Sequence, residues 1–480
     1  MAPRVNQMLN ILEVQLKLVR SIAHILDEEH QKIQNETLEL LAVKLKIAVG
    51  SIESVMESTP SGNEKDKVRR WKYALVQQKI DKAIQDLELW QQMFDPSWYL
   101  IMKAATPQID AELRSYERVA ATDTHTHTTI SSAQSLRSAL DTISANKVPI
   151  FLPENGLDSL QLHDIPLSSA TIGRREDHTK SLILERFKPG INVRQVEKDV
   201  RDLARKLANS SALEFGLLNC KGVIKHGGND STSPGPTAFT VVFRVPPGFS
   251  QPRSLRSCLQ DMKETDSLSD RFRLANELAR SVSYVHTFGF VHKNIRPETI
   301  LLLTNEESSI GSAFLIGFDN FRAADGKTLH KIDSAWERCL YQHPSRMGVM
   351  PTEDHAMQHD IYSLGVCLLE LGLWESFVSY DDKYSYLPND GRSTNATRTA
   401  TLGADVLPLV FKDRLLSLAR GPLRRRMGSK YSEVVVTCLT CLDPGNTDFG
   451  DENEFQDADG IQVGVRYIEK VTMRLNNISA

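Results

Sequence analysis

The sequence has little of what marks secreted, membrane-spanning or nucleic-acid-binding proteins. Its six cysteines are scattered over 480 residues, unlike the dense disulfide framework of a small secreted domain. The longest apolar run, around residues 361–374, is too short to span a bilayer, and the mixed-charge start after Met1 does not resemble a signal peptide. The formal net charge of −4 gives no bulk attraction to nucleic acid. We therefore expect a soluble, cytoplasmic protein without a nucleic-acid partner.

Metal-binding and redox patterns are incomplete. Cys438 and Cys441 are separated by two residues, but they fall in a predicted helix at 432–442 with no second cysteine pair nearby. Two core cysteines are therefore a better interpretation than half of a zinc site. His125 and His127 alternate in a polar loop that offers no third or fourth ligand. The sequence predicts no metal site.

The first 145 residues show the three-and-four spacing of amphipathic helices. Four main helices are predicted, over residues 6–28, 35–55, 76–94 and 107–116. Because the breaks between them are short, they favour an antiparallel bundle over residues 1–145.

Residues 146–178 contain three prolines and few periodic apolar positions, and we predict that they form a linker. From residue 179 the spacing becomes strand-like. Strands are predicted at 181–187, 215–225 and 238–245, with a helix at 193–207. The chain is therefore expected to be an α+β protein in which a helical bundle precedes a mixed domain.

Residues 272–319 are the most informative stretch. An amphipathic helix ends at Gly289, and a loop then leads into two apolar strands at 299–303 and 313–316. The letters YVHTFGFVHKNIRPETILLL, followed later by GFD, resemble the C-lobe of a protein kinase, where the pattern is Y-L-H-x-x-G-x-x-H-R-D-L-K-P-E-N-I-L-L and then D-F-G. The resemblance implies a two-lobed kinase-like fold over 179–480, with a shortened N-lobe (179–247) and a C-lobe (248–480).

The resemblance also implies that the catalytic groups have been replaced. Asn294 stands where a kinase has its general base, and Thr299 and Gly317 stand where it has its two metal ligands. Phosphoryl transfer is mostly positioning and electrostatics, so these losses remove nearly all that the protein contributes. The full set of degenerate positions is His292, Lys293, Asn294, Arg296, Thr299, Gly317, Phe318 and Asp319. We expect a pseudokinase without a cofactor, although weak binding of ATP stays open.

Further kinase positions are matched with less detail. The third N-lobe strand of a kinase carries a phosphate-binding Lys, and here Glu185 or Arg186 takes its place. Glu197 matches the acidic residue of helix C, so Arg186 and Glu197 are the candidates for contacting a nucleotide. Asp360 and Gly365 match the start of the central C-lobe helix, D-x-W-S-x-G, and are expected to be structural.

The layout of the two parts adds a second resemblance. A helical bundle ahead of a degenerate kinase lobe is similar to the fungal HeLo-type pseudokinases of incompatibility and programmed cell death, and to the animal mixed-lineage kinase-like effector of necroptosis. Residues 71–98 and 427–467 are similar to segments of the fungal group.

This second resemblance implies that the pseudokinase lobe controls the bundle. From this resemblance we expect protein partners, self-association through the bundle, and membrane contact on activation. Three functions remain open: a regulatory pseudokinase, a membrane-disrupting cell-death effector, and an atypical active kinase that binds ATP.

Overall fold

The computed structural model describes most of the chain beyond residue 149 and little before it. The described residues are 17, 20, 35, 109–111, 113–114, 133–134, 137, 150–174, 181–189, 193–208, 211–227, 238–261, 267–305, 308–319, 321–323, 336–347, 355–378, 407–446, 448–449 and 461–478. The chain divides into two compact units, Met1–Arg137 and Ser138–Ala480.

The predicted bundle lies almost entirely outside the described residues. Where the fourth helix was predicted, residues 109–111 and 113–114 are helical, and Ile109 and Leu113 are buried as their spacing predicts. Arg137 donates from Nη2 to Asp110 Oδ2 over 3.0 Å. The four-helix arrangement itself stays a prediction.

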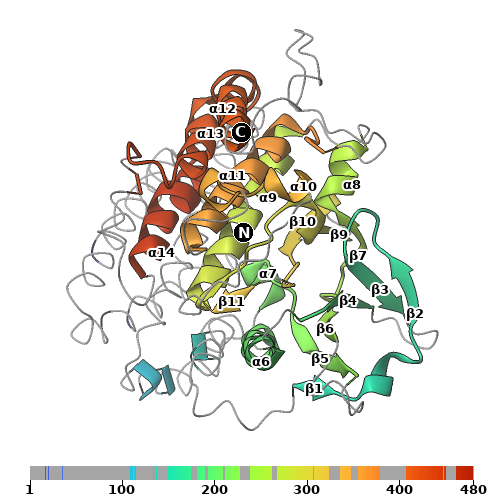
Figure 1. Ribbon diagram of the computed structural model, residues 1–480. Coiled ribbons are helices and arrows are strands. Elements are labelled where there is room, and N and C mark those ends of the chain that lie inside the picture. The colour runs from blue at the N-terminus through green and yellow to red at the C-terminus, as the bar shows by residue number, and fades with distance from the viewer. Residues whose placement is uncertain are drawn as a thin grey trace, which may run out of the picture. The chain divides into compact units, whose positions relative to one another are not determined.

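The second unit is mixed α+β and begins with a six-stranded sheet (Figure 1). Its strands are β1 (Phe151–Leu152), β2 (Gln161–Asp164), β3 (Ala170–Arg174), β4 (Leu182–Phe187), β5 (Cys220–His226) and β6 (Ala238–Arg244). Their order is β1-β5-β6-β4-β3-β2, and the pairs are antiparallel except for β1 with β5. The run of apolar residues in β6 is buried on both faces, as suits a strand in the middle of a sheet.

The sheet corrects the predicted linker and the predicted shortening of the N-lobe. Residues 146–178 contain β1, the 3-10 helix η3 (Glu154–Leu157), β2 and β3. The prolines mark turns within the sheet: Gly156 donates its N–H to Pro153 O over 3.0 Å, and Pro166 lies in the turn between β2 and β3. Strands of two to five residues are too short for alternation to be recognised.

Two helices accompany the sheet. The helix α6 (Val193–Ala208), predicted at 193–207, is confirmed and contacts β5, and the short α7 (Ala212–Phe215) leads into that strand. After β6 the chain crosses to the C-lobe through residues 245–249.

Helices dominate the C-lobe (Figure 1). They are α8 (Leu255–Gln260), α9 (Leu268–Thr287), η4 (Pro297–Thr299), α10 (Trp336–Cys339), η5 (Pro344–Arg346), α11 (Met357–Leu373), α12 (Leu407–Leu418), η7 (Ala419–Leu423), α13 (Arg424–Leu439), α14 (Ile461–Tyr467), η9 (Ile468–Thr472) and α15 (Met473–Asn476). Short strands complete it: β7 (Ser250–Ser254), β8 (Phe290–Val291), β9 (Ile300–Asn305), β10 (Ser308–Leu315) and β11 (Arg322–Ala323). They pair as β10-β9-β7 and β11-β8.

The helix α11 is the centre of the C-lobe core, since its residues from Ile361 to Leu373 are buried all round. Gly365 lets α13 approach, because an added Cβ there would lie 2.8 Å from Cys438 Cβ. Cys438 and Cys441 are buried free thiols, which agrees with their interpretation as core residues.

A fully buried Arg256 ties three C-lobe segments together. Its Nε donates to Glu298 Oε1 over 2.9 Å, and its Nη1 donates to Glu370 Oε1 over 2.5 Å. Tyr341 and Ser376 also accept from this guanidinium. Burial alone would lower the pKa of Arg256, but Glu370, Tyr341 and Glu298 outweigh burial and raise it well above its ordinary value.

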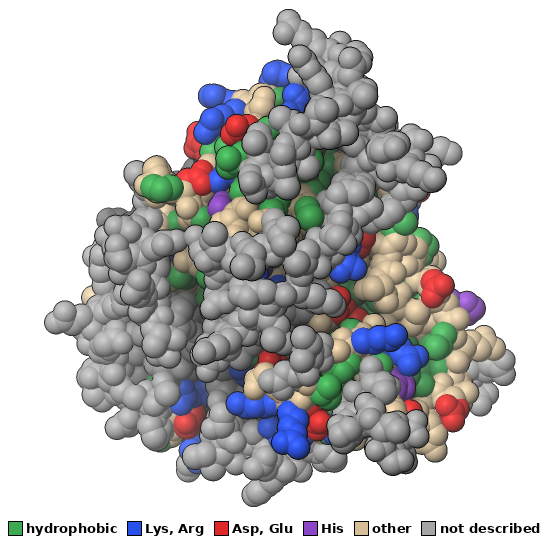
Figure 2. Space-filling view, in the orientation of Figure 1, with side chains coloured by type: hydrophobic (Ala, Val, Ile, Leu, Met, Phe, Trp, Pro, Cys, Tyr) green, Lys and Arg blue, Asp and Glu red, His purple; other side chains and the backbone are tan. Residues whose placement is uncertain are grey.

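On the face drawn in Figure 2, the described Lys and Arg side chains occur together with Asp and Glu side chains. None of the helices among the described residues has the length and apolarity needed to cross a membrane.

Candidate functional site

The loop 292–299 is held by hydrogen bonds to Asp360, a buried residue in the first turn of α11. Its carboxylate accepts the backbone N–H of His292 over 2.7 Å and that of Lys293 over 2.9 Å. His286 and His355 contact the same carboxylate through Nε2, at 3.2 and 3.1 Å. Burial alone would raise the pKa of Asp360, but the hydrogen bonds from the two histidines prevail and hold it well below the usual value.

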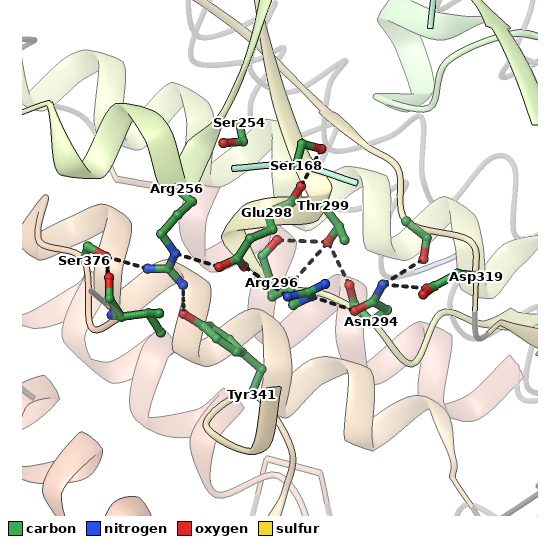
Figure 3. A network of polar contacts seen from close by, with 12 residues as sticks. Ser168, Ser254, Arg256, Asn294, Arg296, Glu298, Thr299, Asp319, Tyr341 and Ser376 are labelled. Atoms are coloured by element: carbon green, nitrogen blue, oxygen red, sulfur yellow. Dashed lines mark hydrogen bonds and ion pairs between the residues drawn. The ribbon is translucent and has the colours of Figure 1, made fainter. Parts of the chain in front are cut away.

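Asn294, at the position of the kinase base, is engaged on both sides of its amide (Figure 3). Its Nδ2 donates to Asp319 Oδ1 over 2.7 Å and to Gly317 O over 3.3 Å. Its Oδ1 accepts from Arg296 Nε over 2.8 Å. The structure thus brings together the predicted positions 294, 296, 317 and 319, and joins them to one another.

The two positions that hold metal in a kinase, Thr299 and Gly317, are in direct contact here. The Thr299 hydroxyl lies 2.7 Å from Asn294 O, to which it donates. Gly317 has a φ of +94°, and an added Cβ would lie 2.3 Å from Thr299 Cγ2. An aspartate therefore cannot stand at 317 in this backbone conformation.

Strand β4 presents Glu185 to this loop, and the adjacent Arg186 is exposed. Glu185 is buried, and its Oε2 accepts the N–H of Gly317 over 3.1 Å and that of Phe318 over 3.3 Å. A carboxyl group thus stands where the resemblance requires a phosphate-binding Lys. The sequence could not choose between 185 and 186, and the pleat of the strand makes that choice.

Glu185 and Asp319 are an acidic pair, and the pKa of each carboxyl group is raised above its ordinary value. Burial, followed by the charge of Asp319, raises the pKa of Glu185 to about 8. Burial also raises the pKa of Asp319, against the opposing charge of Arg296. At neutral pH a proton therefore remains on Glu185.

Glu197 on α6 forms ion pairs with Lys225 on β5 and with Arg201 on its own helix. Its Oε1 lies 2.6 Å from Lys225 Nζ on β5 and 3.2 Å from Arg201. Lys225 also lies over the ring of Phe151, 3.8 Å from its centroid. Lys225 was not foreseen, and since β5 is far from α6 in sequence no local pattern could have shown the pairing.

His292 and Phe318 complete the inner wall of the site. The ring centroids of these buried residues are 4.8 Å apart. Burial lowers the pKa of His292 to about 4, so the imidazole is neutral at physiological pH.

These residues do not fit the magnesium nucleotide of a kinase. The hydroxyl of Thr299 is bonded to backbone, Gly317 has no side chain, and Glu185 would place a carboxyl group near the phosphates. Among the described residues, no group of three or more His, Cys, Asp or Glu side chains is arranged to hold a metal ion.

Gly317→Ala should lower the free energy of unfolding by about 2–5 kcal/mol, because it combines an unfavourable φ with a clash. Thr299→Ser in the same chain should recover part of the loss by removing the clashing methyl group. The measurement is chemical denaturation of the full chain. Gly445→Ala is the control, since an added Cβ there meets no atom within 4 Å; equal effects at 317 and 445 would contradict the described contact.

Glu185→Gln should stabilise the protein at high pH and not at low pH. The carboxyl has a pKa of about 8 when folded against 4.5 ordinarily, so its contribution to stability is fully present below pH 4.5 and is lost as pH rises toward 8. Glutamine keeps the acceptor for Gly317 and Phe318 without the titration. At pH 8 the gain should be on the order of 1–4 kcal/mol.

The measurement for Glu185→Gln is the difference in unfolding free energy from wild type between pH 5 and 8.5. Glu433→Gln, at an exposed position on α13, is the control and should change stability by less than about 0.5 kcal/mol throughout. A difference for Glu185→Gln that does not grow with pH would contradict the raised pKa.

Comparison with known proteins finds partial similarity to protein kinases. No family model matches the sequence. Over 105 residues, 21% of this chain and 16% of the relative, it is 32% identical to eukaryotic translation initiation factor 2-alpha kinase 1 of Mus musculus. It is 24% identical to the probable serine/threonine-protein kinase gdt4 of Dictyostelium discoideum over 105 residues, 22% of this chain and 6% of that protein. These matches, each spanning a small part of the relative, support a protein kinase-like fold.

Proposed function

We propose that this protein is a catalytically inactive, kinase-like regulatory protein that signals through its conformation and its contacts with other proteins. The observation that carries the proposal is the interlocking of Asn294 with Arg296 and Asp319, while β4 directs Glu185 at the same place. An amide bonded at both ends cannot accept a proton from a substrate hydroxyl.

Electrostatics supports the same proposal. A triphosphate that approached this loop would meet the Glu185 and Asp319 carboxyl groups, with Arg296 already bonded to Asn294. An ionised Asp319 about 4 Å from a phosphate group would repel it by roughly 4 kcal/mol at an effective dielectric constant near 20, whereas Glu185, protonated at neutral pH, adds no repelling charge. Arg296 is thus engaged by the protein itself, and no cofactor is part of the proposal.

The kinase-like names of the relatives keep an atypical active kinase as the alternative. In that case Asp319 would act as a displaced metal ligand, since it is the acidic side chain beside Asn294.

We expect no phosphoryl transfer. Full-length protein incubated with radiolabelled ATP and magnesium or manganese should incorporate no label above background, into itself or into a generic substrate. Its melting temperature should also not rise with magnesium-ATP. Incorporation that is abolished by Asp319→Asn, with folding retained, would instead establish the alternative.

The regulated part in this proposal is the N-terminal segment, residues 1–145, which resembles a HeLo-type bundle. The lobe would restrain this segment, and release would permit self-association or contact with membranes, as in a cell-death pathway of the fungal type. Such control requires a partner that binds two states of the lobe with different affinity.

Residues 1–145 alone should therefore self-associate or bind liposomes more than the full chain does at matched concentration. Sedimentation and liposome flotation measure the two properties, and leakage of a trapped dye distinguishes membrane disruption from simple binding. If the fragment is folded by circular dichroism yet stays monomeric and unbound, the lobe does not restrain it and the proposal of release fails.

A further inference from the structure

The turn between β2 and β3, residues 165–169, is bonded to the C-lobe (Figure 3). Ser168 Oγ donates to the backbone oxygen of Glu298 over 3.0 Å. Ser254 Oγ donates to the backbone oxygen of Pro166 over 2.7 Å. Ile165, at the start of the turn, is 2% exposed. The partners of the first hydrogen bond are 130 positions apart in the sequence, and those of the second are 88 positions apart. These two long-range bonds fix one short turn.

The position of this turn follows from the sheet. β4 corresponds to the third strand of a kinase N-lobe, so β2 and β3 correspond to the first two. The turn 165–169 therefore stands where a kinase has its glycine-rich phosphate loop, and it contains no glycine. A proline, a leucine and two serines give it side chains and a defined shape instead.

The conformation of the turn shows that its contacts hold it in place. Leu167 has a φ of +52°, which is unfavourable for a residue with a side chain. Ser168 N donates to Ile165 O over 3.1 Å, and Ile165 N donates to Ala170 O over 3.2 Å. A non-glycine residue keeps such a backbone only where its surroundings determine it.

The groups that the turn contacts are themselves fixed. Ser254 is fully buried and caps α8 by accepting the N–H of Ser257 over 3.1 Å. Glu298 is bonded through its side chain to the buried Arg256. The turn is therefore fastened to the same polar network that joins α8 and α11.

We propose that residues 165–169 are a strap, built into the fold, that closes over the loop 292–299 and couples the two lobes through Ser168 and Ser254. The strap is a two-state element: closed as described, or open with these two hydrogen bonds broken. A partner that prefers the open state would uncover the loop and loosen the N-lobe sheet from the C-lobe. This inference does not depend on whether the protein transfers phosphate.

Hydrogen–deuterium exchange of the full chain tests the strap. Ser168→Ala removes the hydrogen bond to Glu298 O and also the bond that Ser168 Oγ accepts from the N–H of Ala170 over 3.3 Å. Because each net hydrogen bond changes an opening equilibrium by about 2- to 12-fold, exchange in peptides covering 165–174 should speed by at least that factor. Ser168→Ala with Ser254→Ala should speed it further, and exchange in 292–301 should rise too, because the strap covers this loop. Peptides from α11 should not change.

Three control variants separate the strap from other effects. Ser168→Thr keeps the hydroxyl and should exchange as wild type does. Ser169→Ala changes the exposed neighbour in the same turn. Ser267→Ala removes a serine that caps α9 as Ser254 caps α8, and should leave residues 165–174 unaffected.

The outcomes decide the proposal. Because Ser168 is half-buried and its substitution removes no core packing, Ser168→Ala carries the test even if the Ser254 variant does not fold. Unchanged exchange at 165–174 in Ser168→Ala would overturn the strap. Faster exchange at 165–174 without any change at 292–301 in the double variant would overturn its closure over the loop.

Discussion

The buried carboxylate of Asp360 is the interaction on which the rest of the site depends. It accepts two successive backbone N–H groups of the loop, at His292 and Lys293, and Lys293 has a φ of +66°. Charge-assisted hydrogen bonds of this kind contribute about 1.5–3 kcal/mol each, enough to stabilise such a backbone. Histidines from α9 and from the segment before α11 reach the same carboxylate. The loop thus has a fixed shape that needs no bound ligand.

The side chains at four of the replaced positions, 294, 296, 299 and 319, are hydrogen-bonded within the protein, whereas Glu185 Oε1 and His292 Nε2 are buried without a partner among the described residues. Asn294 binds Arg296 and Asp319, Thr299 binds the loop backbone, and Glu185 accepts the N–H groups at Gly317 and Phe318. In a site prepared for a ligand, some of these groups would face the space left for it. Here both partners of these hydrogen bonds come from the protein. The bonds connect Glu185 on β4 to residues 317 and 318, and connect Asp319 to the loop 292–299.

The sequence predicted the parts with strong periodicity or a long motif. The helices at 193–207 and 272–288 and the strands at 181–187 and 299–303 are found as α6, α9, β4 and β9. It missed β1, β2 and β3, because short strands with prolines at their turns look like a linker. It left Glu185 and Arg186 undecided, because a shift of one residue exchanges the two faces of a strand. Ser168, Lys225 and Arg256 act through distant partners, which no local pattern reveals.

The replaced positions contact one another, so restoring the kinase residue at one position would disturb the residues at the others. A side chain at 317 needs the space of Thr299, and an aspartate at 294 would face Asp319 where the amide now donates. A lysine at 185 would lose the two acceptor contacts to the N–H groups of 317 and 318. Substitutions in one bonded network are not additive, and each reversal alone is expected to destabilise the loop. The positions 185, 294, 317 and 319 therefore form one cooperative structural unit, in which each residue depends on the others.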